Sequence, residues 1–230
     1  MKEIDNIFID VRNAFRLLND YQKRVLQIVK YIREQTPYTD MWGRKDWYSD
    51  KIGNRRNSPD PEYANLSVHP DMWAWDFLYG YFFEYYFGKK QIENKSVKMS
   101  LFQVSDDGFF VSNDEKRHWT NTSSFASSES SHSFIVFNIS VYTSKESRLW
   151  LRNSKEDNDC KRFLTDFLSS TNEIKIVHDD SECCIIKKYE MQRFSSQHEA
   201  DDVIRDFGKI VKDNTDIKLF KKSFYELIEE

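Results

Sequence analysis

The sequence predicts an α+β protein. We expect a long N-terminal helix and a central aromatic helix packed on a mainly antiparallel sheet of about five to six strands, with C-terminal helices. Three observations predict this fold: apolar residues at helical spacing over residues 3–35, ten aromatic rings within residues 71–88, and alternation of period two in most segments after residue 96. Helices placed before and after a run of strands are typical of the α+β class.

The chain of 230 residues is long enough to bury one substantial core. We expect one compact domain with three parts: a helix over residues 1–36, a proline-containing connector over 37–70 and an α+β core over 71–230. The boundaries of the connector follow from the prolines, which all lie in it: Pro37, Pro59, Pro61 and Pro70.

Residues 3–35 predict one helix that ends before Pro37. Its seam alternates spacings of three and four, with one polar interruption: Phe8, Val11, Phe15, Leu18, Gln22, Val25, Val29 and Ile32. This heptad pattern is compatible with a coiled coil that makes the protein a homodimer. A flanking apolar row widens the stripe and favours packing within the same chain instead: Ile7, Ala14, Tyr21 and Ile28. The homodimer through residues 3–35 stays open as the alternative.

The aromatic segment 71–88 fits two secondary structures. Every odd-numbered residue from Trp73 to Phe87 is aromatic, and such alternation is typical of a strand. The ends favour a helix, because Asp71 is a suitable N-cap and Gly88 is a suitable C-terminal stop. We therefore predict a buried central helix, with a strand as the alternative.

The remaining elements follow from the same two periods. Alternation predicts strands near 97–101, 109–111, 135–142, 148–152, 173–178 and 182–193. We expect Asp106, Asp107 and Gly108 to form the turn of a hairpin between the first two. Helices are predicted near 157–169, after the capping box formed by Ser196 and Glu199, and near 216–229.

Several chemistries find no support in the sequence. Its six glycines form neither a dinucleotide fingerprint nor a P-loop, and its three cysteines have neither zinc spacing nor a disulfide framework. We therefore expect no cofactor and no metal. The formal charge of −4 gives no general attraction for nucleic acid, and the apolar segments are too short to span a membrane. We expect a cytoplasmic protein.

These observations favour a non-enzymatic protein-interaction or adaptor protein, whose protein partner the sequence does not identify. The candidate surface combines aromatic rings with arginines, the residues that dominate interface hot spots: Trp42, Arg44, Trp47, Tyr48, Arg55 and Arg56. The same combination of rings and cations is compatible with binding of single-stranded nucleic acid, which is one alternative.

The alternative enzyme is a Mg²⁺-dependent nuclease with a restriction-type core. Its candidate residues are carboxylates and a lysine near strand ends, which can hold Mg²⁺ and orient water: Asp106, Asp107, Glu173 and Lys175. Asn138 and Ser140 stand where such a core carries its acid and lysine, so a nuclease of this kind would be degenerate.

Overall fold

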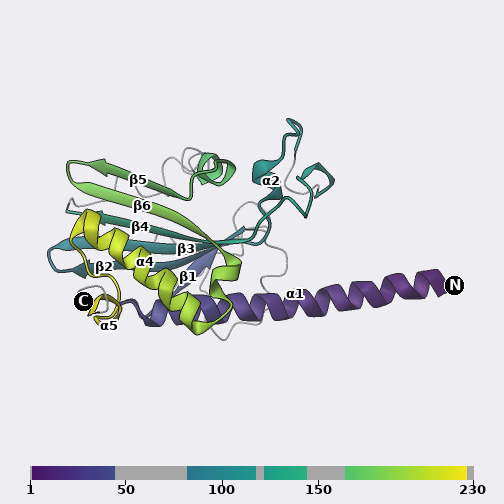
Figure 1. Ribbon diagram of the computed structural model, residues 1–230, viewed down its shortest axis with the longest axis horizontal. Helices are drawn as coiled ribbons and strands as arrows, with labels where there is room; N and C mark the ends of the chain where they lie inside the picture. The colour runs from purple at the N-terminus through teal and green to yellow at the C-terminus, as the bar shows by residue number, and fades with distance from the viewer. Residues whose placement is uncertain (1, 45–81, 118–121, 144–163, 227–230) are drawn as a thin grey trace, which may run out of the picture.

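The computed structural model describes residues 2–44, 82–117, 122–143 and 164–226, and it confirms the α+β fold. The described strands form one antiparallel sheet in the order β1-β2-β3-β4-β6-β5 (Figure 1). Their bounds are β1 Trp42–Arg44, β2 Phe82–Ile92, β3 Lys95–Val104, β4 Phe134–Tyr142, β5 Ile174–Asp179 and β6 Glu182–Glu190. Two long helices, α1 (Lys2–Glu34) and α4 (Gln197–Thr215), accompany the sheet.

Apolar clusters cover both faces of the sheet. The larger cluster joins one face to α1 and α4, with Phe137 of β4 beside Phe207 of α4 at a ring distance of 4.8 Å. The smaller cluster lies on the other face and includes Phe110 and Phe167. Because both faces are covered, the central strands are buried along almost their whole length.

Helix α1 confirms the predicted N-terminal helix, but only its C-terminal half lies against the domain. Val25, Val29 and Ile32 are fully buried in the larger cluster. The polar interruption of the seam, Gln22, is also buried and accepts a hydrogen bond from Nε2 of Gln103 at 3.1 Å. The N-terminal half extends beyond the end of the sheet (Figure 1).

The helix predicted for residues 71–88 is wrong over the part that the structure describes. Residues 82–92 form β2, which pairs with β3. A strand covered on both faces can bury a ring at every position, so the rings did not require a helix. Gly88, which was predicted to end a helix, lies instead at a β-bulge. It has a φ of 103°, and the pairing register of β2 with β3 shifts between Tyr86 and Gly88.

The hairpin predicted around Asp106–Gly108 is also wrong. Residues 108–111 form a helical turn, α2 (Gly108–Val111), because Asp106 and Asp107 supply local acceptors. Oδ1 of Asp106 accepts from the Gly108 amide at 2.8 Å, and the Asp107 carbonyl accepts from the Phe110 amide at 2.7 Å. The hairpin partner of β3 is β2, across the turn at Glu93 and Asn94.

The C-terminal third follows the predictions closely. Strands β5 and β6 form the expected hairpin, and residues 164–169 are helical. Ser196 and Glu199 form the capping box at the start of α4. The final helix begins later than predicted, with α5 described over Ser223–Glu226, while residue 216 is the left-handed C-cap of α4. The residues between α4 and α5 form no regular element and bury Leu219 and Phe220.

Some predictions lie outside the described residues. These are most of the connector 37–70, residues 71–81 of the aromatic segment, the strand at 148–152 and the first part of the helix at 157–169. Among the helices that are described, none is long and apolar enough to cross a membrane.

Candidate functional site

The predicted partner-binding residues are only partly described. Trp42 and Arg44 lie in β1 at the edge of the sheet, where their backbones pair with Tyr86 and Glu84 of β2. The other four lie outside the described residues: Trp47, Tyr48, Arg55 and Arg56. The surface composed of these six residues stays a prediction.

The four nuclease candidates come from two strands that are separated in the sheet by β4 and β6. Asp106 and Asp107 follow β3, while Glu173 directly precedes β5 and Lys175 lies on it. Lys188 of β6 lies near enough to Asp107 and Glu173 for the charges of both carboxylates to act on its pKa, each in the direction that raises it. Within the described parts of the chain, no group of three His, Cys, Asp or Glu side chains is arranged to hold a metal ion.

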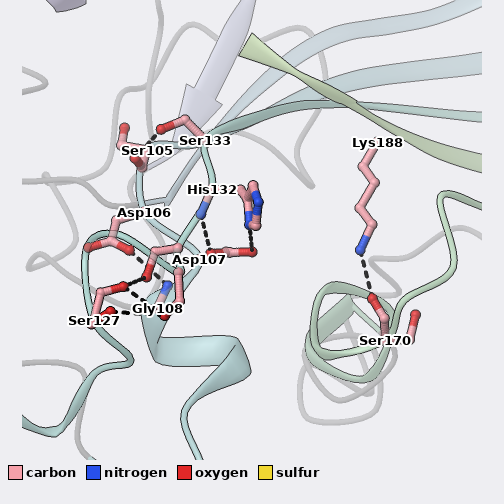
Figure 2. A network of polar contacts seen from close by, with 11 residues as sticks. Ser105, Asp106, Asp107, Gly108, Ser127, His132, Ser133, Ser170 and Lys188 are labelled. Carbon is pink, nitrogen blue, oxygen red and sulfur yellow. Dashed lines mark hydrogen bonds and ion pairs between the residues drawn. The ribbon is translucent and has the colours of Figure 1, made fainter. Parts of the chain in front are cut away.

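Asp107 is the centre of a polar cluster at the end of β3 (Figure 2). One carboxylate oxygen accepts from the His132 backbone amide at 2.6 Å, and the other lies 3.9 Å from Nδ1 of the same histidine. The Asp107 amide donates to the His132 carbonyl at 3.0 Å. Burial raises the pKa of Asp107, against the lowering effect of these contacts. The cluster therefore ties the segment before β4 to the end of β3.

Lys188 joins the same end of the sheet to the helical turn at residues 164–169. Its Nζ donates to the Ser170 carbonyl at 2.7 Å, as Figure 2 shows, and lies 5.4 and 5.5 Å from the ring centroids of Phe134 and Phe167. Burial lowers the pKa of Lys188. Asp107 and Lys188 therefore hold together three segments of the chain: the end of β3, the segment before β4 and the helical turn at residues 164–169.

A buried band of polar side chains crosses the face of the sheet that carries the smaller apolar cluster. The sequence interpretation missed this band. Ser100 of β3 donates to Glu84 of β2 at 2.8 Å, and Ser140 of β4 donates to Glu182 of β6. Asn138 lies between these pairs, fully buried, and its Nδ2 has no hydrogen-bond partner among the described residues. The signal was available in the sequence: Glu84 interrupts the aromatic segment.

The N-terminal half of α1 carries the largest group of exposed apolar side chains in the described chain. Seven large apolar residues between positions 7 and 18 are at least 42% exposed: Ile7, Phe8, Ile9, Val11, Phe15, Leu17 and Leu18. On a helix of 3.6 residues per turn, most of them share one face. We call this face the free stripe, composed of Ile7, Phe8, Val11, Ala14, Phe15 and Leu18.

The free stripe continues the buried seam of the same helix. Four residues further along that face are at most 3% exposed: Gln22, Val25, Val29 and Ile32. The change comes at Tyr21, whose hydroxyl donates to Ser105 Oγ at 3.2 Å where the domain begins. One face of one helix is thus covered by its own domain at one end and uncovered at the other.

The family comparison covers most of this architecture. A family model described as PM0109 matches residues 1–216, which run from α1 to the C-cap of α4. The chain belongs to the PM0109 family. The matched region includes both halves of α1 and therefore the free stripe. Neither a curated protein nor a solved structure matches the chain.

Proposed function

We propose that the protein is an adaptor that works by binding a protein partner through the free stripe of α1. The observation that carries this proposal is the continuity of the stripe with a buried seam. The same face that buries Val25 and Val29 exposes Phe8 and Phe15 where the domain ends. In this proposal the protein supplies a binding surface and no chemistry of its own.

The energetics of an isolated helix support the proposal. A lone helix shorter than about 12–15 residues is marginal in water, and helices in proteins gain most of their stability by packing an apolar face. Residues 7–18 gain little from their own domain, because their large apolar side chains remain exposed. A partner that covers the free stripe would remove its apolar surface from water and stabilise this half of α1.

The size and position of the stripe also support a binding surface. Contiguous apolar patches of several hundred Å² on a protein surface usually mark interaction sites. The opposite side of the helix mixes exposed polar residues such as Asn13 and Asp20 with two apolar ones, Ile9 and Leu17. The stripe is the side on which apolar residues form a continuous row, as in a helix that binds a partner along one face.

Site-specific photo-crosslinking in the producing cell tests the proposal. A photoreactive amino acid replaces Phe15 on the free stripe, and in a matched variant it replaces Asn13 on the opposite side. We expect the probe at residue 15 to form a defined protein adduct and the probe at residue 13 to form none. Absence of an adduct from residue 15, or equal adducts from both positions, would overturn the proposal.

A further inference from the structure

We infer that the occupant of the free stripe is a second copy of this chain, bound antiparallel around a two-fold axis near Val11. The inference rests on the proposed function and names its partner. It uses three observations: the apolar area of the stripe, the end of the helix at which the domain sits, and the size of the residues that an antiparallel pair would bring together.

The apolar area of the stripe supplies most of what a small interface between two identical helices needs. Its five large residues are 42–58% exposed, and a large aromatic ring can bury about 150–250 Å². The stripe therefore offers roughly 400–500 Å² of apolar surface per copy, so a symmetric pair buries roughly 900 Å² before its polar flanks are added. This approaches the roughly 1,000–1,200 Å² at the lower limit of specific interfaces.

The position of the domain determines the direction of the pair. From Tyr21 onward, the face that carries the stripe is occupied by the chain's own sheet and α4. In a parallel pair, the domains of both copies would need the same space beside residues 21–32. In an antiparallel pair the two domains lie at opposite ends, and each free segment lies along the other.

The exposed apolar residues of the stripe give the register. An antiparallel overlap centred near Val11 sets Ile7 of one copy level with Phe15 of the other, so that exposed apolar side chains of both copies meet. In this register Phe8 of one copy faces Ala14 of the other, a large side chain opposite a small one. Such alternation of sizes is how facing helices interdigitate.

Light scattering on the full chain tests the association. At tens of micromolar we expect twice the chain mass of 27.7 kDa for the wild type and for Asn13→Asp, and the chain mass for Phe15→Asp. Phe15 lies outside both apolar clusters of the domain, so near-UV circular dichroism should be the same in all three proteins. A wild-type protein of chain mass would overturn the inference.

Disulfide trapping tests the direction and does not depend on a disruptive variant. We expect Phe8→Cys mixed with Ala14→Cys to form a disulfide-linked pair on mild oxidation, while each variant alone and the wild type form none. Rapid linkage of Phe8→Cys to itself would show a parallel pair and overturn the inference.

The photo-crosslinking experiment separates failure of this inference from failure of the proposed function. An adduct between residue 15 and a second copy supports both. An adduct with another protein, together with a wild-type chain mass in solution, overturns the inference and leaves the proposed function intact.

Discussion

Asp107 shows how one buried carboxylate can organise three segments of the chain. Its side chain accepts the His132 amide, and its charge acts on Lys188, which in turn contacts Ser170. In the sequence, Asp107 looked like a hairpin turn or a metal ligand. In the structure it accepts hydrogen bonds within the chain, so we expect its substitution to affect stability first.

Replacing Asp107 separates its hydrogen bond from its charge. We expect Asp107→Ala to lower the free energy of unfolding by about 1–3 kcal/mol, because the His132 amide loses a buried acceptor. Asp107→Asn keeps an acceptor oxygen and should cost much less. Urea unfolding of the three proteins at neutral pH, at one fixed protein concentration, measures both effects. Equal losses for Ala and Asn would contradict the hydrogen-bonding role.

The pH dependence of the same site has a definite sign. Burial raises the pKa of Asp107 in the folded state above its ordinary value of 3.8. A raised pKa means that the neutral carboxyl adds to the stability of the folded state. This contribution is fully present below pH 3.8 and is lost as the pH rises through the folded-state pKa. Relative to Asp107→Asn, the wild type should become less stable over this range and then level off. A difference that stays constant with pH would contradict the raised pKa.

At the scale of single elements, the buried polar band of the sheet is the least expected feature. Glu84 and Ser100 are almost fully buried and are bonded to each other across β2 and β3. Removal of a partner from a buried charged or polar group costs more than loss of an exposed contact. The band should therefore be sensitive to single-atom changes.

Two serines of the same strand provide a matched test. We expect Ser100→Ala to lower the free energy of unfolding by about 1–3 kcal/mol, because Glu84 loses a buried donor. Ser96→Ala removes a contact with Gln91, which is exposed, so water can replace the lost bond and the effect should be clearly smaller. Thermal unfolding of both variants decides this, and an equal or larger effect at Ser96 would contradict the account.

Elements with one clear period could be predicted from the sequence. Strand β4, the β5–β6 hairpin, α1 and the capping box of α4 were all predicted close to their observed bounds. The aromatic segment was not, because its rings satisfy a helix and a doubly covered strand equally well. Whether the second face of a strand is covered depends on residues that are distant in the sequence, so the local pattern of rings does not reveal it.

The sequence interpretation placed the partner surface at residues 42–56 and not on the free stripe, although the pattern that forms the stripe was visible. The seam and its wide flank were visible, and the flank correctly indicated that α1 packs on its own domain. The sequence did not show that this packing stops at Tyr21, because the pattern of apolar residues is the same on both sides. Only the length of the sheet, which is set by the fold, determines how much of the helix stays uncovered.

At the scale of the whole molecule, the protein is a covered sheet with one helix that extends beyond it (Figure 1). The sheet, α4 and the second half of α1 form a packed body whose side chains contact one another. The first half of α1 makes few such contacts and carries the free stripe. We propose that a protein partner covers that half in solution.

Hydrogen exchange of the backbone amides of residues 7–18 tests this claim most directly. Slow exchange requires a helix that is stabilised by packing, and residues 21–32 provide the internal standard. At tens of micromolar, we predict slow exchange over residues 7–18 in the wild type and fast exchange in Phe15→Asp, with residues 21–32 slow in both. Equally fast exchange over residues 7–18 in the two proteins would contradict the account.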